Sequence, residues 1–388
     1  MTRPLHIAFI GQRGLPATYG GIEHHVEELG SRLAERGHRV TVFCRDNYGA
    51  ACPVDRPQWF RGMRLITLPT VRTKHCEAIV HSAAAAAFTV GRVPFDVVHY
   101  HALGPGLVSP ITRWGSSARV VQTVHGLDNH RAKWGGAAQK LLTLGEHASA
   151  RVPDRTLVVS ESLRKHYAVE HGRDVEHIPN GVVAPTPSDT DGVRRELGLD
   201  SRPYVLFVGR LVPEKAPDVL LEAFRRIRNR DVQLVLAGGS SFTDRFVASL
   251  REQASRDSRV TLTGFVYGET LRALYAGARM FVLPSRLEGL PLTLLEAASH
   301  GISVIASNIA PHREVVSVSG PGRRLVQTDP SDLAAAIDSE LDDPERGRVG
   351  AERLRSEVLR RYDWEEVTSR TEQVYRELVA DRPRSLAA

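Results

Sequence analysis

The sequence is poor in cysteine: Cys44, Cys52 and Cys76 are the only thiols in 388 residues, and no two are in CxxC spacing. Such a set argues against a disulfide framework or a thiolate zinc site and fits a reducing compartment. Long apolar runs are lacking too, because the alanine-rich run at 83–88 is far shorter than the ~20 residues of a spanning helix. The N-terminus has no signal-peptide pattern. We therefore expect a cytoplasmic protein, with the inner face of the membrane as an alternative.

Several common ligand signatures are missing as well. The glycines after the first apolar segment stand at 11, 14, 20 and 21, which is not GxGxxG, and no acid ends the following segment 39–44. This spacing disfavours a nicotinamide cofactor. We find no DxD-type acidic pair in a loop that could hold a cation, and no RRM, KH, zinc-finger or basic-helix signature. We expect no cofactor, no metal and no nucleic acid partner.

Charge is present but unevenly divided. The net charge is +6, and residues 1–185 carry 22 Lys and Arg against 15 Asp and Glu, whereas residues 186–388 carry 29 against 30. A basic first half can attract a phosphate ligand or an anionic membrane surface. Genomic bias towards arginine explains the excess equally well, so we keep peripheral membrane contact as one interpretation.

Short apolar segments alternate with amphipathic helical patterns along the whole chain. The pattern starts at residues 6–11 (HIAFIG) and restarts at residues 204–209 (YVLFVG), after a stretch rich in Pro, Ser, Thr and Asp. This alternation predicts α/β architecture with parallel sheets covered on both faces. We expect two Rossmann-like doubly wound domains that face each other across a cleft. The predicted boundaries are 1–185, 186–365 and a final helical segment at 366–388.

Doubly wound domains bind ligands at the carboxyl ends of their strands, so the loops after strands are informative. The loop 209–216 (GRLVPEKA) carries Arg210 and Lys215, five positions apart. Two cations that converge from such a loop suit a diphosphate, which needs dispersed positive charge and several donors. The alternative is a pair of solvated surface cations.

The segment EGLPLTLLE places Glu288 in a loop and Glu296 inside a helix that we expect to begin at Pro291. The free N–H groups of Leu290 and Leu292 could cradle phosphate oxygens at this helix N-terminus. Glu296 could accept both hydroxyls of a ribose, and Glu288 could hold the hydroxyls of a sugar beyond the phosphates. Alternatively, both acids simply favour the helix dipole.

The first half offers two further candidates. Gly20 and Gly21 precede a helical pattern, and paired glycines let the backbone come close to a ligand. His125 ends a strand-like segment, where it could face a crevice. A tight turn and a structural histidine are the alternatives.

Together these segments resemble a known family. Residues 209–224 and 284–307 resemble the retaining, two-domain (GT-B) glycosyltransferases of family 4, and Glu288 and Glu296 match the E-x7-E signature of that family. Residues 7–29 are similar to the N-terminal domain of a rhamnosyltransferase-like subgroup. The resemblance implies an enzyme, of the hexosyltransferase type, that uses a nucleoside-diphosphate sugar.

The resemblance also assigns roles to single residues. It implies that Arg210 and Lys215 hold the donor diphosphate, that Glu288 contacts the transferred sugar and that His125 lies at this sugar. These four form the expected catalytic set. The expected donor site consists of Gly20, Gly21, Arg210, Lys215, Thr263, Phe265, Val266, Glu288, Gly289, Leu290, Pro291, Leu292 and Glu296. Glu23 and Asn129 are expected on the acceptor side, Asn180 is an unassigned neighbour, and the final helix would cross back onto the first domain.

The resulting hypothesis is a metal-independent transfer of a hexose or deoxyhexose to a sugar-containing or small-molecule acceptor. A rhamnose-like sugar is one option for the transferred group. Retention would follow from front-face attack, in which the departing phosphate takes the acceptor's proton; a glycosyl-enzyme on two carboxylates is the alternative route. Such an enzyme would serve glycan, polysaccharide or secondary-metabolite biosynthesis. Two alternatives remain: a nucleotide-sugar epimerase on a similar two-domain fold, and a non-catalytic nucleotide-sugar binder.

Overall fold

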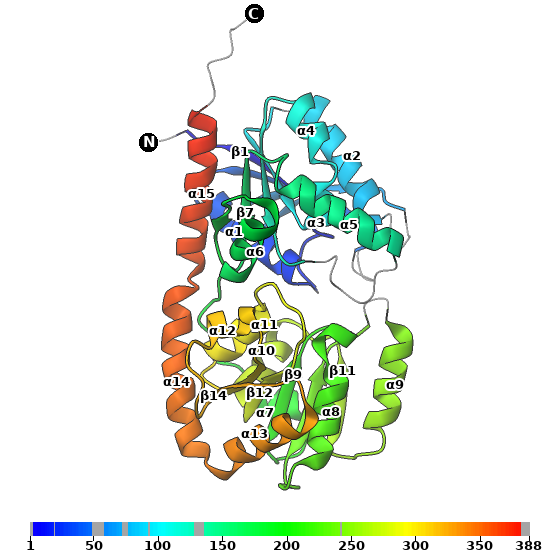
Figure 1. The fold of residues 1–388 in the computed structure, drawn as a ribbon, viewed down its shortest axis with the longest axis vertical. Coiled ribbons are helices and arrows are strands. Elements are labelled where there is room, and N and C mark those ends of the chain that lie inside the picture. Colours follow the sequence, from blue (N-terminus) through cyan, green and yellow to red (C-terminus); the bar gives the residue numbers. More distant parts are fainter. Residues whose placement is uncertain are drawn as a thin grey trace, which may run out of the picture. The chain divides into compact units, whose positions relative to one another are not determined.

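The computed structural model describes residues 3–18, 20–48, 58–71, 77–91, 94–127, 136–240 and 243–381. These residues form two compact units, and Figure 1 labels many of their helices and strands. The first unit contains residues 1–180 together with 364–388, and the second contains residues 181–363. The chain therefore enters the second unit close to the predicted linker and returns to the first unit for its last helix.

The first unit is built around a sheet whose strands follow the order β3-β4-β2-β1-β5-β6-β7-β8. All neighbouring strands are parallel except β3 and β4. Its elements are β1 His6–Ile10, α1 Gly21–Glu35, β2 Arg39–Arg45, β3 Trp59–Phe60, β4 Met63–Leu68, α2 Glu77–Gly91, β5 Val97–His101, α3 Leu103–Gly106, α4 Ser109–Gly115, β6 Arg119–Val124, α5 Gly136–Ser149, β7 Arg155–Val158, α6 Glu161–His171, β8 Glu176–His177 and α15 Trp364–Ala380.

The second unit has a wholly parallel sheet in the order β11-β10-β9-β12-β13-β14. Its elements are α7 Thr190–Glu196, β9 Tyr204–Val208, the 3-10 turn η2 Pro213–Lys215, α8 Pro217–Arg226, β10 Gln233–Ala237, α9 Asp244–Ala254, β11 Val260–Gly264, α10 Gly268–Gly277, β12 Met280–Leu283, α11 Leu292–Ser299, β13 Ser303–Ser307, α12 Ala310–Val315, β14 Arg323–Val326, α13 Pro330–Asp342 and α14 Pro344–Arg361.

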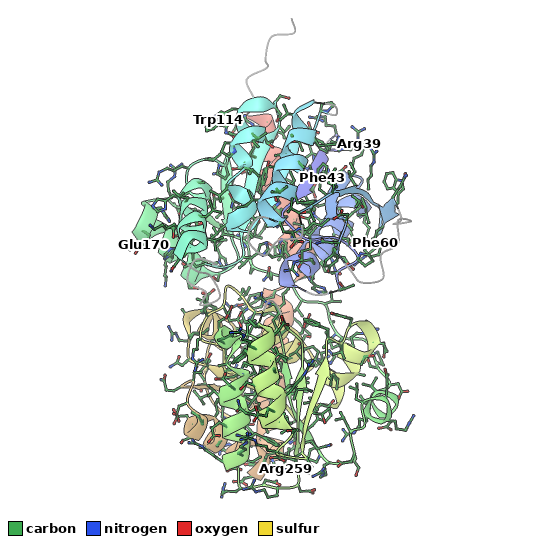
Figure 2. All side chains as sticks on the ribbon, turned by 90° about the vertical axis from the view of Figure 1, so that its right-hand side faces the viewer. Arg39, Phe43, Phe60, Trp114, Glu170 and Arg259 are labelled. Atoms are coloured by element: carbon green, nitrogen blue, oxygen red, sulfur yellow. The ribbon has the colours of Figure 1, made fainter. Side chains whose placement is uncertain are left out.

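The central strands are buried along their whole length because helices cover both faces of each sheet. Every residue of β1, β5, β9, β10 and β13 is buried. This explains why most of these strands are apolar runs, whereas β5 (VVHYH) buries two histidines, His99 and His101. Two buried clusters fill the first unit. Phe43, labelled in Figure 2, belongs to one of them.

The last helix, α15, belongs to the first unit and packs beside α1 (Figure 1). Trp364 and Tyr375 are fully or almost fully buried in the same cluster as the apolar face of α1. Arg36 of α1 adds ion pairs to Glu365 at 2.7 Å and Glu372 at 3.1 Å. The residues that follow the second unit in sequence thus complete the core of the first.

Each sheet has one point at which the chain changes its winding direction. In the first unit this point lies between β1 and β5, and in the second it lies between β9 and β12. Loops at the carboxyl ends of two such strands diverge to opposite faces, which leaves room for a ligand. The predicted loops 209–216 and 284–292 follow β9 and β12, respectively.

No helix in the described part of the chain is both long enough and apolar enough to span a bilayer.

Candidate active site

A buried ion pair at the edge of the second sheet joins the two predicted loops. Nζ of Lys215, at the end of η2, donates a hydrogen bond to Oε1 of Glu288 at 2.5 Å. The side chains of Lys215 and Glu288 are only 12% and 10% exposed. An ion pair this well shielded from water is part of the folded structure and not a chance contact between surface side chains. It places a cation and a carboxylate at the β9–β12 switch point.

The electrostatics of this pair are clear. Burial by itself would raise the pKa of Glu288, but the ammonium of Lys215, together with smaller contributions from His312 and Ser285, holds the pKa below its ordinary value. Glu288 is therefore a carboxylate at neutral pH. His312 lies close enough to interact electrostatically with Glu288, and burial lowers its pKa to about 4, so it is uncharged. Lys215 has three N–H donors, and one bond to Glu288 leaves donors for a phosphate oxygen.

Arg210 follows β9 on the same loop and is partly exposed. The backbone of this loop is fixed by two hydrogen bonds: Leu211 N donates to Gly239 O at 2.9 Å, and Lys215 N donates to Val212 O at 3.0 Å. The predicted pair of cations thus belongs to an ordered loop. The side-chain contact of Lys215 is with Glu288, a partner that the sequence analysis had assigned to a different ligand group.

The helix α11 begins one residue later than expected. The sequence predicts Pro291 at the first helical position, whereas the helix starts at Leu292 and Pro291 is its N-cap, with ψ at 110°. Proline tolerates both positions because it has no N–H to satisfy. The backbone of Leu292 therefore opens the helix, and Gly289, Leu290 and Pro291 form its buried approach.

Glu296 lies in the second turn of α11 and is held by Tyr275 of α10, whose hydroxyl donates to Oε2 of Glu296 at 3.0 Å. Burial raises the pKa of Tyr275 well above its ordinary value, and the nearby carboxylate adds to this effect. The phenol therefore stays protonated and donates. This contact orients one oxygen of Glu296. No motif in the sequence points to Tyr275 as its partner.

The remaining predicted donor residues lie at the end of β11. Thr263 and Val266 are partly exposed, and the ring of Phe265 is 38% exposed. The ring planes of Phe265 and Tyr267 are nearly parallel, at 13°, with centroids 6.2 Å apart. A Cβ at Gly239 would come within 2.5 Å of the Phe265 ring, so this glycine leaves space for the aromatic side chain. The loop thus presents an exposed aromatic surface at the edge of the sheet.

In the first unit, the loop between β1 and α1 is closed by Glu23. Its Oε1 accepts a hydrogen bond from Arg13 N at 2.9 Å, and the side chain is buried. Gly20 has φ of 109°, and a Cβ at this position would lie 1.9 Å from Oε2 of Glu23. Gly20 is therefore required by the loop itself. Gly21, the first residue of α1, is exposed.

These contacts give Glu23 a structural task, and its predicted contact with the acceptor stays a prediction. Asn129 lies outside the described residues.

His125 belongs to a histidine cluster that consists of His25, His99, His101 and His125. His101 ends β5, at the switch point, and its Nδ1 lies 3.1 Å from Nε2 of His125. Stacking joins His101 to His99, with ring centroids 4.3 Å apart. Burial first, and the neighbouring imidazoles second, lower the pKa of His99, His101 and His125 well below the ordinary value.

Asn180 anchors this cluster from the end of the first unit. Its Oδ1 lies 2.9 Å from Nδ1 of His25, and burial lowers the pKa of His25 to about 4. Asn180 and His125 are among the residues predicted from the sequence, whereas His25, His99 and His101 are not. The alternation in VVHYH, which directs His99 and His101 to the same face of β5, is the signal that could have found two of them.

Taken together, the two units are α/β domains of the nucleotide-binding type, and the switch point of the second carries a buried cation–carboxylate pair beside a helix N-terminus. A buried cation beside a free helix N-terminus at such an edge has the chemistry that suits a phosphorylated ligand.

Comparison with known families gives the same class. Residues 202–343 match the family described as glycosyl transferases group 1, and residues 19–185 match Glycosyltransferase Family 4. A D-inositol 3-phosphate glycosyltransferase of Geodermatophilus obscurus is 31% identical over 392 residues, which cover 91% of this chain and 84% of that protein. The chain belongs to the family 4 glycosyltransferases.

Two further relatives support this placement. A GDP-mannose-dependent alpha-(1-6)-phosphatidylinositol monomannoside mannosyltransferase of Mycolicibacterium smegmatis is 28% identical over 371 residues, 90% of this chain and 93% of that protein. Sucrose-phosphate synthase from Thermosynechococcus elongatus superposes with a TM-score of 0.82 at 26% identity, covering 97% of this chain and all of that one.

HepE of Anabaena, solved in complex with UDP-glucose, gives a TM-score of 0.80 at 19% identity and covers 96% of this chain and 100% of that one, a likeness of fold alone. The fold is GT-B, as predicted. The protein is a glycosyltransferase that uses a nucleotide-sugar donor.

Proposed function

We propose that this protein transfers a hexose or deoxyhexose from a nucleoside-diphosphate sugar to a sugar-containing or small-molecule acceptor, with retention at the anomeric carbon. The observation that carries the proposal is the buried pair of Lys215 and Glu288 at the switch point of the second unit. A carboxylate suits sugar hydroxyls, and an ammonium suits the phosphate to which the sugar is attached.

The residues supply electrostatic catalysis. As the bond between the anomeric carbon and the phosphate oxygen breaks, negative charge grows on the departing diphosphate. Lys215, Arg210 and the N-terminal amides of α11 are suited to stabilise this charge. In front-face attack, the acceptor oxygen bonds to the anomeric carbon and its proton passes to a phosphate oxygen of the leaving diphosphate. This step needs no carboxylate nucleophile. Glu288 can therefore accept hydrogen bonds from sugar hydroxyls while it stays paired with Lys215.

Under this proposal no metal is needed at the donor diphosphate, because protein cations neutralise it. Glu296 would bind the ribose through the oxygen that Tyr275 orients. The loop of Phe265 and Val266 would face the base.

Two relatives are named for phosphatidylinositol monomannoside and for D-inositol 3-phosphate. These names favour a polar, phosphate-bearing or glycan acceptor, and the enzyme would then serve glycan or metabolite biosynthesis.

We also propose peripheral contact with an anionic membrane through the basic first half. Trp114 of α4, labelled in Figure 2, is 77% exposed, and Ile111 of α4 and Val90 of α2 are each 40% exposed. Exposed tryptophan and aliphatic side chains suit a membrane interface. Vesicles with acidic lipids should bind the wild type, and Trp114→Ala should weaken binding more than Trp59→Ala, a control whose side chain is 63% exposed. Equal binding by both variants would rule this surface out.

The enzymatic proposal is tested by donor binding and turnover. UDP-, GDP- and dTDP-sugars are compared by thermal shift, since a ligand stabilises the folded state according to its affinity. The best donor is then offered with and without acceptors, and the anomeric configuration of the product is read by NMR. Glu288→Gln keeps the shape of the side chain and should lose most transfer activity. As a control for metal dependence, the wild type is assayed with and without EDTA.

Three outcomes would each reject the proposal: an inverted product, donor isomerisation without any acceptor, or binding without transfer or hydrolysis. A wild-type activity that EDTA abolishes would reject metal independence alone.

A further inference from the structure

Three imidazoles from separate elements of the first unit converge. His25 comes from α1, His101 from the end of β5, and His125 from the residue after β6. One ring nitrogen from each lies within 4.8 Å of the other two. Nδ1 of His101 and Nε2 of His125 are 3.1 Å apart. Because all three belong to one compact unit, their convergence is a property of that unit alone.

The ring of His25 is held in a defined orientation. Nδ1 of His25 lies 2.9 Å from Oδ1 of Asn180, an oxygen that can only accept, so Nδ1 carries the proton. Nε2 is then the nitrogen with the free lone pair. In metal sites, histidine ligands are oriented in this way by a hydrogen bond from the second ring nitrogen. Asn180 thus performs for His25 the task that such a partner performs in a metal site.

The lone pair on Nε2 of His25 accepts no hydrogen bond from the described residues. Nε2 of His25 and Nε2 of His101 are both buried and find no hydrogen-bond partner among them. His25 is 3% exposed and His101 is 0% exposed. A buried polar atom without a partner costs free energy, because it has lost its hydrogen bonds to water. A group that accepts the lone pair of His25 would remove this cost.

We propose that His25, His101 and His125 bind a divalent transition metal ion of the Zn²⁺ type, with three imidazole nitrogens and an open fourth position. Zinc binds imidazole nitrogen at about 2.0–2.1 Å, so two ligands of a tetrahedral site lie about 3.3 Å apart. The 3.1 Å separation of Nδ1 of His101 and Nε2 of His125 is close to this value. A small inward movement of His25 completes the set. Imidazole is a preferred ligand of Zn²⁺, Ni²⁺ and Cu²⁺.

The access route agrees with this assignment. His125 is partly exposed, whereas His25 and His101 are buried, so the ion would enter past His125. If His125 contacts the transferred sugar, a bound ion competes with that contact and inhibits transfer. This consequence rests on the proposed function; metal binding itself does not.

A second group of possible ligands in the first unit provides a control. Glu146 of α5 lies between His166 and His171 of α6, with its Oε1 at 2.6 Å and 2.8 Å from their Nε2 atoms. Both Nε2 atoms of this group are thus hydrogen-bonded to the carboxylate, whereas Nε2 of His25 in the first group finds no partner among the described residues. We therefore expect this group to bind no metal tightly, and His171→Gln separates the two groups in an experiment.

The direct test is a zinc titration of tag-free, chelator-treated, full-length protein against a chromogenic chelator. We expect about one Zn²⁺ per chain in the wild type, and weakening by about tenfold or more in His25→Gln and in His101→Gln. His24→Gln, a neighbour on the same helix, and His171→Gln should bind like the wild type. Wild-type protein that takes up no zinc, or binding lost in His171→Gln but retained in His101→Gln, would overturn the proposal.

X-ray absorption of the zinc-loaded wild type covers the case in which the variants do not fold. Three imidazole ligands are expected, and a spectrum of two imidazoles with a carboxylate would refute the assignment. The activity test is separate: zinc should inhibit transfer, and chelator should restore it. Metal-free protein that binds zinc as expected but shows no transfer with any donor would reject the proposed function and leave the metal site standing.

Discussion

The ion pair of Lys215 and Glu288 gives the most demanding prediction. Lys215→Met removes the cation and leaves the Glu288 carboxylate with a side chain that is only 10% exposed. Breaking a buried pair by removing one partner typically costs about 3–5 kcal/mol, because an uncompensated charge remains. For a domain of the second unit's size, each kcal/mol lowers the melting temperature by about 2–4 °C. Lys215→Met should therefore melt about 6–20 °C below the wild type.

The double variant Lys215→Met/Glu288→Leu distinguishes this cause from lost packing. Replacing both partners by apolar side chains removes the stranded charge, so the double variant should be more stable than Lys215→Met. The matched control is Arg256→Met. It breaks an ion pair with Glu252 whose side chains are 65% and 70% exposed, and an exposed pair contributes below about 1 kcal/mol.

Differential scanning calorimetry without ligand measures these differences. A melting temperature for Lys215→Met equal to that of Arg256→Met would refute the buried pair in solution. A double variant less stable than either single variant would show that the side chains stabilise the fold by packing and not by charge.

Three further predictions follow. The histidine cluster should make the first unit sensitive to acid, because burial lowers the pKa of each histidine below its ordinary value of 6.5. The stability is complete above pH 6.5, and below it each histidine lowers the free energy of unfolding by about 1.4 kcal/mol per pH unit. Tryptophan fluorescence in urea measures this, because all four tryptophans belong to the first unit, and a flat profile between pH 7 and 5.5 would contradict it. Asn180→Ala should cost about 1–3 kcal/mol in the same assay, since Nδ1 of His25 loses its acceptor; an unchanged urea midpoint would argue against that bond. Glu296→Gln should weaken binding of a ribonucleoside diphosphate by about tenfold or more, with a smaller effect on its 2′-deoxy analogue, while Tyr275→Phe should show a milder form of the same pattern in calorimetry; equal losses for both nucleotides would remove the ribose from the account.

Much of the architecture could be predicted because parallel strands buried on both faces need continuous apolar sequence. The repeat of HIAFIG as YVLFVG gave two α/β domains, and the linker chemistry placed their border near residue 185, close to the division at 180 and 181. The rule that ligands gather after strands selected loops 209–216 and 284–292. These loops do follow β9 and β12, the two strands at which the second sheet changes direction.

What the sequence determined by itself was local: which segments form strands, which loops follow them, and which residue types those loops carry. Only the tertiary structure decided which distant side chains meet, because no short segment of sequence specifies the order of strands in a sheet. Only the adjacency of β9 and β12 brings Lys215 to Glu288, 73 positions away. Likewise, the order of β1, β5 and β6 brings His101 to His125, and the end of the first unit supplies Asn180 to His25. A partner's charge and a ring's burial set the chemistry of these groups, and both follow from the folded sheet.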